Sequence, residues 1–370
     1  MRILSIGSGT QIFQPGCEDR KRMAEYGKMS ERFDILISCV GHFDDQQISD
    51  GVFLHATNSK NKLFRFIDSL KIGNKLMKEN KSDTVFVQDP LINGLIGWLL
   101  AKKHKAKLMV SVFGTSVFDK YWQREHWYNI FLKYIGMKVM KDADVIQTDG
   151  IGNFEVLKQR YREKVFWKPV VPSDIHEYLV DSKLFLPDKV RLLFVGRLAK
   201  QKNIAMLAEV IRIMSVREYP FEAEFTIVGD GPERKWLKGL ENFSNIKRVN
   251  FCNRQELNDQ YKNNDILLMT SFYEGFPRVF MEAAVNGLAF VVTDVSGAKN
   301  IIDEGKNGFI IKQKDVEDFV AKTEKLISDR ELLGGFSKHT LESFSTKYDY
   351  NLSIQRHNQI MDYLKQQHVK

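Results

Sequence analysis

The sequence predicts an α/β protein with two domains, each built on a doubly wound parallel sheet. The chain has 370 residues, about twice the length of a typical domain. Short apolar runs alternate with segments long enough for helices, a pattern typical of parallel sheets with right-handed crossovers. A segment with three prolines, residues 169–187, separates two such series. We therefore expect domains over residues 1–172 and 188–346, followed by a helical segment over residues 347–370.

Each half of the chain contains five runs that predict strands. In the first half they are Arg2–Ile6, Asp34–Val40, Thr84–Gln88, Lys107–Phe113 and Val145–Thr148. In the second half they are Val190–Val195, Glu224–Val228, Arg248–Phe251, Ile266–Met269 and Ala289–Thr293. Open α/β sheets bind ligands at the carboxyl ends of their strands, so we expect both sheets to turn these ends toward one central cleft.

The composition argues against a disordered chain and against one that spans a membrane. Hydrophobic residues make up 43% of the sequence and aromatic residues 12%. The longest apolar stretch, residues 91–101, is too short to cross a bilayer, and the N-terminus predicts a first strand and no secretory signal. The three cysteines form no CxxC pair, which favours a reducing compartment. We expect a cytoplasmic protein with free thiols and no metal site.

The net charge of +8 is confined to the first half of the chain. Residues 1–170 contain 27 Lys and Arg against 19 Asp and Glu, or +8, whereas residues 171–370 contain 28 of each. Two basic segments stand out: residues 60–81 have the pattern of an amphipathic helix, and residues 120–141 interleave lysines with aromatic side chains. They favour a peripheral location at the inner face of an anionic membrane, with ordinary packed helices as the alternative. Nucleic acid is not expected, because no recognition motif accompanies the charge.

The stretch Ser271–Ala284, SFYEGFPRVFMEAA, is the strongest candidate for a binding site. It follows the apolar run Ile266–Met269 and precedes a segment with helical periodicity, so it predicts strand, loop and helix. We expect Pro277 at the first helical position. The loop amides of Gly275 and Phe276 then lie beside the positive end of the helix, which favours a bound anion.

Two glutamates flank this turn. At a rise of about 1.5 Å per residue, Glu282 lies about 7 to 8 Å along the helix from Pro277, far enough to reach past a diphosphate toward a ribose. Glu274 precedes the helix and would meet whatever lies on the other side of the phosphates. The alternative is that both are ordinary surface charges.

Two cations follow the first strand of the second half. Arg197 and Lys202 leave the same strand end and could clamp a diphosphate, Arg197 as a fork and Lys202 as a point charge. The alternative is that both are solvated loop residues. The turn Gly229–Pro232, GDGP, ends the next strand, and it predicts either part of the site or simply a tight turn before a helix.

Three motifs together resemble the signature set of a known family. They are FVGRLAKQKN at 194–203, VGDGPE at 228–233 and EGFPRVFMEA at 274–283. In order and spacing they resemble the glycosyltransferase group 1 family (GT4), whose members are retaining transferases of the GT-B fold. The resemblance covers residues 188–312 closely, and the first half mainly at the GSG turn of residues 7–9. It implies two Rossmann-like domains facing a central cleft, with the C-terminal helix packed back on the first domain.

The resemblance also implies roles for individual residues. Arg197 and Lys202 would hold the diphosphate of the donor, Glu282 the ribose hydroxyls and Glu274 the hydroxyls of the donor sugar. The loop with Asn253 and Arg254 would lie against the base. The other implied positions around the nucleotide sugar are Gly7, Gly9, Gly196, Gly275, Phe276, Pro277 and Val279. The implied reaction transfers a sugar from a UDP-, GDP- or ADP-sugar to a saccharide or lipid-linked acceptor with retention of configuration, and it requires no metal.

The chain departs from the family pattern at three positions. Phe113 stands after the fourth strand, where many members have a histidine that contacts the donor sugar. Asn300 replaces a common glutamate, and Cys252 or Asn253 occupies the place of a common glycine. These departures bear on donor identity more than on the fold. Separately, residues 142–144 spell the DxD of metal-dependent transferases of another fold, but they precede a strand, so we predict a structural role.

Other functions stay open. Gly7-Ser8-Gly9 begins like a dinucleotide fingerprint, although Ile12 stands in place of its third glycine, so the signal for NAD is weak. A GT-B-fold sugar-nucleotide epimerase would share the donor site. A nucleotide-sugar-binding protein with impaired catalysis would keep the site without turnover, and Phe113 makes this alternative conceivable.

Overall fold

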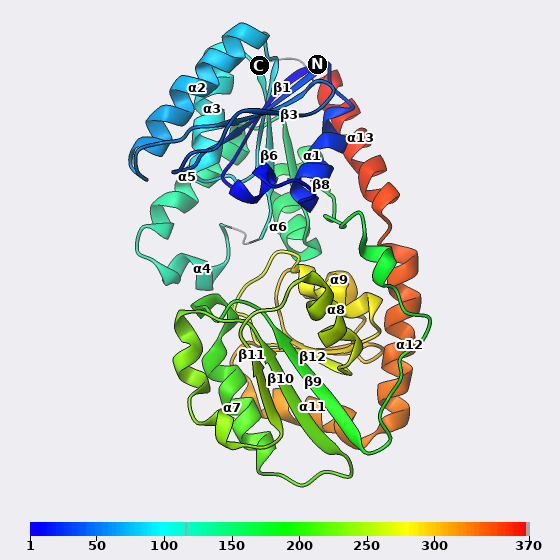
Figure 1. Cartoon of the computed structure of the whole chain (residues 1–370). Coiled ribbons are helices and arrows are strands. Elements are labelled where there is room, and N and C mark those ends of the chain that lie inside the picture. The colour runs from blue at the N-terminus through cyan, green and yellow to red at the C-terminus, as the bar shows by residue number, and fades with distance from the viewer. Residues whose placement is uncertain (115–116, 368–370) are drawn as a thin grey trace. The chain divides into compact units, whose positions relative to one another are not determined.

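Residues 1–114 and 117–367 are described in a computed structural model (Figure 1). Contacts divide the chain into two units, the first formed by Met1–Ser173 with the C-terminal residues from Tyr350 onward, and the second by Asp174–Asp349. Most of the segment expected as a linker therefore belongs to the second unit. Val180 N–H donates to the carbonyl of Val285 at 2.9 Å, which ties this segment to that unit.

The first unit contains an eight-stranded sheet with the order β3-β4-β2-β1-β5-β6-β7-β8. Its strands are β1 (Arg2–Gly7), β2 (Arg32–Ile37), β3 (Gln46–Ser49), β4 (Val52–Ala56), β5 (Thr84–Val87), β6 (Lys107–Val112), β7 (Val145–Thr148) and β8 (Val165–Trp167). All neighbours are parallel except β3, which runs antiparallel to β4. The five predicted strands are confirmed. The sequence analysis missed β3, β4 and β8, which lie toward the edges of the sheet. Strands there are less buried, so their sequences are less uniformly apolar.

Helices cover both faces of this sheet. They are α1 (Glu18–Gly27), α2 (Phe64–Asn80), α3 (Ile92–His104), α4 (Lys120–Glu125), α5 (Asn129–Asp142), α6 (Ile151–Tyr161) and α13 (Tyr350–Gln366). Alternate residues of β1 enter two different cores, because side chains of a strand point to opposite faces. Leu4 packs with residues of α2, α3 and α5, whereas Ile3 packs with residues of α1 and α13.

The C-terminal helix α13 is part of the first unit and packs beside α1 (Figure 1). Lys107 Nζ donates to the carbonyls of Leu364 and Lys365, both at 2.9 Å, and so caps the end of α13. The His357 ring stacks on Tyr26, with ring centroids 3.8 Å apart. Burial lowers the pKa of His357 well below its ordinary value and raises the pKa of Tyr26 to about 12, so both groups stay neutral at physiological pH.

The second unit contains a six-stranded parallel sheet with the order β11-β10-β9-β12-β13-β14. Its strands are β9 (Lys189–Val195), β10 (Glu222–Val228), β11 (Ile246–Val249), β12 (Ile266–Met269), β13 (Ala289–Thr293) and β14 (Gly308–Ile311). Its helices are α7 (Ile204–Ser215), α8 (Arg254–Lys262), α9 (Arg278–Val285), α10 (Ala298–Ile301), α11 (Val316–Ser328) and α12 (Arg330–Lys347). All five predicted strands are present, and β14 was missed.

The order of the second sheet reverses between β9 and β12. The chain moves from β9 outward to β10 and β11 on one side, then returns to β12 on the other side. Open α/β sheets bind ligands at such a switch point, outside the carboxyl ends of the two strands. The motif at 194–203 covers the end of β9 and the loop after it, and the stretch at 271–284 covers the loop after β12 and most of α9. Among the described residues, no helix combines the length and the apolarity needed to cross a membrane.

Candidate functional site

Hydrogen bonds join the loop that follows β9 to the loop that follows β12. Phe272 N–H donates to the carbonyl of Gln201 at 2.8 Å, and the Gln201 side-chain amide donates to the carbonyl of Tyr273 at 3.0 Å. The Thr270 hydroxyl donates to the carbonyl of Lys202 at 2.9 Å. The two predicted motifs therefore form one structural element at the switch point of the second sheet.

Lys202 and Glu274 meet in this element. Lys202 Nζ donates to Glu274 Oε1 at 2.6 Å, and the Ser271 hydroxyl donates to the same oxygen at 3.1 Å. The two charged side chains are only 13% and 10% exposed. Removing one partner of such a partly desolvated ion pair is costly, because the charge that remains would be poorly solvated. The predicted cation and the predicted carboxylate are thus held in direct contact.

Gly196 lets the lysine approach. An added Cβ at Gly196 would lie 3.2 Å from Lys202 Cε, so a larger residue would press on the aliphatic part of the lysine. Arg197, the next residue, is exposed, and its guanidinium forms no ion pair within the described ranges. The predicted diphosphate clamp therefore consists of one cation held by a carboxylate and one that points to solvent.

The GDGP turn packs against this clamp. Gly229 has φ +128°, and a Cβ added there would lie 2.1 Å from the carbonyl oxygen of Gly196. A Cβ added to Gly231 would lie 2.4 Å from the carbonyl oxygen of Leu198. Leu198 N–H donates to the carbonyl of Asp230 at 3.0 Å, which holds the two backbones together. The turn therefore supports the loop of Arg197 and Lys202 through close backbone contact.

Replacing Gly229 with alanine is expected to lower the free energy of unfolding of the second unit by about 2 to 4 kcal/mol. The methyl group would clash with the carbonyl oxygen of Gly196, and alanine disfavours the positive φ that the backbone has here. Gly239→Ala is the matched control. Gly239 also has positive φ, +86°, but nothing lies within 4 Å of its added Cβ. It should lose only about 1 kcal/mol. Urea unfolding of both variants measures the difference, and equal losses would show that the contact with Gly196 has no importance.

The turn before α9 is formed by Gly275, Phe276 and Pro277. The expected position of Pro277 was wrong by one residue, because α9 begins at Arg278 and Pro277 is its N-cap. The Phe276 ring is buried and stacks on Tyr348, with centroids 5.6 Å apart, so its side chain packs inside the protein. A Cβ added to Gly297 would lie 2.2 Å from the carbonyl oxygen of Gly275, so the next loop braces this turn.

Glu282 lies in α9, and α8 fixes its side chain. The Tyr261 hydroxyl donates to Glu282 Oε2 at 3.0 Å, and Arg278 Nε lies 4.0 Å from Glu282 Oε1. Burial and the neighbouring carboxylate raise the pKa of Tyr261 well above its ordinary value, so the hydroxyl keeps its proton and remains a donor. Sequence reasoning missed Tyr261, whose only signal is its place on the buried face of a short helix. Val279, the other predicted residue of α9, is half-buried.

Asn253 and Arg254 have contacts of their own. The Asn253 side chain accepts a hydrogen bond from Glu256 N–H at 2.9 Å and so caps α8 in a capping box. Arg254 donates to Asp174 at 2.5 Å and to the Tyr178 hydroxyl at 3.1 Å. These bonds hold the start of the second unit against α8. Contact of the two side chains with a nucleobase stays a prediction.

The predicted glycines of the first unit lie at the end of β1, with Gly7 as its last residue and Gly9 in the loop after it. An added Cβ at Gly7 would lie 2.4 Å from Gln88 Oε1, so Gly7 allows this side chain to cross the strand end. At Gly9 nothing lies within 4 Å of an added Cβ, which leaves open space above the backbone. Phe113 follows β6 and is half-buried, and Gly114 beside it has φ +77°. All these residues lie at the carboxyl edge of the first sheet.

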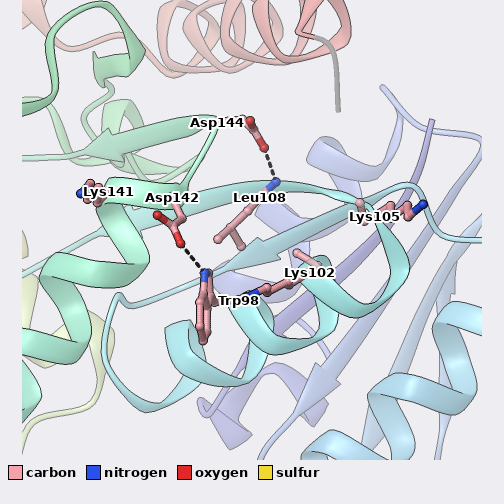
Figure 2. Close-up of a pocket in the computed structure, with 9 residues that line it drawn as sticks. Trp98, Lys102, Lys105, Leu108, Lys141, Asp142 and Asp144 are labelled. Carbon is pink, nitrogen blue, oxygen red and sulfur yellow. Dashed lines mark hydrogen bonds between the residues drawn. The ribbon is translucent and has the colours of Figure 1, made fainter. Parts of the chain in front are cut away.

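The DxD sequence lies at the opposite edge of that sheet. Figure 2 shows Asp142 accepting a hydrogen bond from Trp98 Nε1 at 2.9 Å and Asp144 accepting one from Leu108 N–H at 2.8 Å. Lys138 also pairs with Asp142 at 3.0 Å. Both carboxylates therefore fasten α5 and β7 to their neighbours. In the part of the chain that the structure describes, no group of three or more His, Cys, Asp or Glu side chains could hold a metal ion.

Comparisons with known proteins identify a family model and several relatives that this chain resembles. The model described as "Glycosyl transferases group 1" matches residues 177–340, which lie in the second unit. Protein CapJ of Staphylococcus aureus is 24% identical over 353 residues, covering 86% of this chain and 85% of CapJ. The alpha-monoglucosyldiacylglycerol synthase of Acholeplasma laidlawii is 24% identical over 310 residues, covering 77% of this chain and 76% of that protein.

Solved structures share the fold over the whole chain. Sucrose-phosphate synthase from Thermosynechococcus elongatus has a TM-score of 0.80 at 14% identity and covers 99% of both chains. Anabaena Alr3699/HepE in complex with UDP and glucose has a TM-score of 0.72 at 15% identity, covering 99% of this chain and 100% of that one. At these identities the likeness concerns the fold alone.

Proposed function

Because this chain belongs to the glycosyltransferase group 1 family (GT4) and has its GT-B fold, we propose that it transfers a hexose-type sugar from a nucleotide diphosphate sugar to a saccharide or lipid-linked acceptor with retention of configuration. The donor site lies at the β9/β12 switch point of the second unit. The observation that most supports this proposal is the contact of Lys202 with Glu274 at 2.6 Å, beside the N-terminus of α9. Cation, carboxylate and helix dipole together match a phosphate next to a polyhydroxylated sugar.

The residues have distinct roles in this proposal. Lys202 turns from Glu274 toward the diphosphate, and the exposed Arg197 closes on it from solvent. The first amides of α9 add donors for the same phosphates. Glu274, released from the lysine, accepts hydrogen bonds from hydroxyls of the donor sugar. Glu282, oriented by Tyr261, accepts hydrogen bonds from the ribose hydroxyls.

The proposed mechanism depends on charge stabilisation. Negative charge grows on the diphosphate as the bond to the sugar breaks, and Arg197, Lys202 and the N-terminus of α9 neutralise it. Once the donor is bound, these groups are in place before its bond breaks, so little reorganisation accompanies the transfer step itself. The proposal requires no metal ion, since the side chains and the helix supply the positive charge. Glu274 acts by recognising the sugar, and no proton transfer is assigned to it.

We place the acceptor and the location of the enzyme in the same proposal. The Acholeplasma relative is named for a glucosylated diacylglycerol, which supports a lipid acceptor for a chain of this family. The charge of the first half of the chain, +8, supports contact with anionic lipid. A cytoplasmic enzyme at the inner face of the membrane, acting in cell-surface glycan or glycolipid synthesis, would satisfy both.

A panel of nucleotide sugars tests the proposed function. Thermal unfolding is followed with UDP-, GDP- and ADP-sugars and with NAD, because a ligand that binds only the folded state stabilises it by about 2.7 kcal/mol at 100 times its Kd. We expect one nucleotide series to stabilise the protein and NAD to have no effect. Stabilisation by NAD alone would overturn the proposal. Nucleotide release with lipid and saccharide acceptors then follows turnover, and NMR of the product gives its anomeric configuration.

The same assay addresses the two alternatives. Phe113, where many family members have a histidine, makes a nucleotide-sugar-binding protein with impaired catalysis conceivable. Such a protein would be stabilised by the donor but would release no nucleotide with any acceptor. A sugar-nucleotide epimerase would change the configuration of the donor sugar without an acceptor, which NMR of the donor alone would detect.

A further inference from the structure

Three neighbouring helices of the first unit begin at the same edge of its sheet. Helix α3 packs against both α2 and α5 (Figure 1). Buried residues of all three helices belong to one core. Each of them leads directly into the start of a strand, α2 into β5, α3 into β6 and α5 into β7. Their N-terminal ends therefore all lie at the carboxyl edge of the sheet, where open α/β sheets bind their ligands.

Helix α5 and the residues just before it expose apolar side chains where an ordinary surface helix would be polar. Trp127, Ile130, Phe131 and Tyr134 follow the spacing of one helical face, and all four are exposed, Trp127 by 78%. The Trp127 and Phe131 rings pack edge to face, with centroids 6.0 Å apart, so the aromatic face is partly preordered. The opposite face of α5 is the buried one. The solvent face of α5 is therefore apolar over its first two turns.

The same arrangement recurs on α2 and α3. Leu63, Phe64 and Ile67 are exposed at the start of α2, Leu63 by 84%, and Ile92 is exposed at the start of α3. We call these eight exposed apolar residues the apolar rim: Leu63, Phe64, Ile67, Ile92, Trp127, Ile130, Phe131 and Tyr134. Isolated exposed apolar residues are common, but a group of eight at one edge marks an interaction site.

Lysines follow the apolar rim along each helix. The exposed lysines toward the C-terminal ends are Lys71, Lys75 and Lys78 on α2, Lys102 and Lys103 on α3, and Lys138 and Lys141 on α5 or at its end. Each helix therefore changes from apolar to basic along its solvent face. This order of side chains along the helices matches the layers of a membrane surface. Apolar and aromatic side chains suit the acyl chains and the interface, and lysines suit the lipid phosphates outside them.

We propose that the apolar rim inserts into the headgroup region of an anionic phospholipid bilayer, with the lysines behind it contacting lipid phosphates. Charge repulsion argues against binding of a second copy of this chain to the rim. A two-fold contact through the rim would bring the lysines of the two copies together. Tryptophan, tyrosine and phenylalanine are the side chains favoured at the membrane interface. The inference deepens the proposed function, on which it rests for the lipid acceptor, since the rim would present the acceptor edge of the first sheet to lipid.

Sedimentation with vesicles tests this surface. The full chain is mixed with vesicles of phosphatidylcholine alone or with an equal share of phosphatidylglycerol. We expect binding to the anionic vesicles that weakens with salt, and a fall of at least about tenfold in partitioning for Trp127→Ser/Phe131→Ser. The matched control is Leu184→Ser/Val216→Ser, which removes two apolar residues of the second unit that are 84% and 72% exposed. The control should bind vesicles like the unmodified protein.

The depth to which the apolar rim inserts into the bilayer is measured by fluorescence quenching. Lipids brominated on the acyl chain should quench the fluorescence of Trp127, and Trp127→Phe should keep vesicle binding but lose most of the quenching. Equal vesicle binding by the rim variant and the control would overturn the proposal. So would the absence of binding to anionic vesicles, or a dimer in ultracentrifugation that only the rim variant loses. Stabilisation by nucleotide sugar is recorded for every variant, because its failure would count against the donor site and leave the membrane surface untouched.

Discussion

Replacing Glu274 with alanine is expected to lower turnover by about 10²-fold to 10³-fold while changing the affinity for the free nucleoside diphosphate by less than about threefold. The reason is that the proposed partner of Glu274 is the sugar, whereas the diphosphate is bound by cations and by the start of α9. Removing the carboxylate also frees Lys202, now held at 2.6 Å, for the phosphates. The loss should therefore appear in the transfer step.

Steady-state kinetics with the donor identified by the panel, together with calorimetric titration of its nucleoside diphosphate, separate the two effects. Glu324→Ala is the matched control, because Glu324 also pairs with a cation, Arg217 at 2.6 Å, but lies away from the switch point on α11. It should leave both quantities unchanged. Parallel losses of turnover and of nucleotide affinity in Glu274→Ala would instead mean that this carboxylate organises the whole site.

Replacing Lys202 with alanine is expected to weaken binding of the nucleoside diphosphate by about tenfold to a hundredfold, which is the contribution of a hydrogen bond between charged groups. The adjacent Lys200→Ala is the control, since Lys200 belongs to the same short 3-10 turn but is exposed. Calorimetry on both variants measures the difference. Similar losses at the two positions would indicate general attraction of the nucleotide by positive charge.

The same substitution should also lower stability. It leaves Glu274 almost buried with the Ser271 hydroxyl in place of an ion pair, and removing one partner of a buried pair costs about 3 to 5 kcal/mol. The double variant Lys202→Ala/Glu274→Gln removes the stranded charge. We expect it to regain much of the lost free energy of unfolding in urea, and a double variant less stable than Lys202→Ala would contradict this account of the pair.

Local patterns predicted most of the sheet architecture. The buried run Ile266–Met269 and the run Ala289–Thr293 coincide with β12 and β13, because central strands of a parallel sheet are apolar on both faces. Some polar or short strands lack such an apolar run and were not predicted. β3 has the sequence QQIS and lies at the edge of the sheet, and β14 begins with Gly308, which packs against Phe290.

The candidate site was predictable in part. Glycine and proline located the turns around Gly275 and Gly229, since these residues favour turns whatever surrounds them. The start of α9 was displaced by one residue, and the supporting role of Tyr261 left no local signal, because a tyrosine inside a short helix looks like any other core residue. Asn253 was expected at the nucleobase, and its cap on α8 shows how the same polar side chain also satisfies a helix end.

The sequence by itself determined the two parallel sheets, their loops and the identity of the charged residues on them, because hydrophobic periodicity and turn chemistry act over a few residues. Only the tertiary structure decided which of these residues meet. Lys202 and Glu274 are 72 positions apart, and Tyr261 and Glu282 are 21 apart. The order of the strands brings each pair together, and it also sets three separate apolar helix starts along one edge of the first sheet. Strand order depends on packing across the whole unit, so no local stretch of sequence contains it.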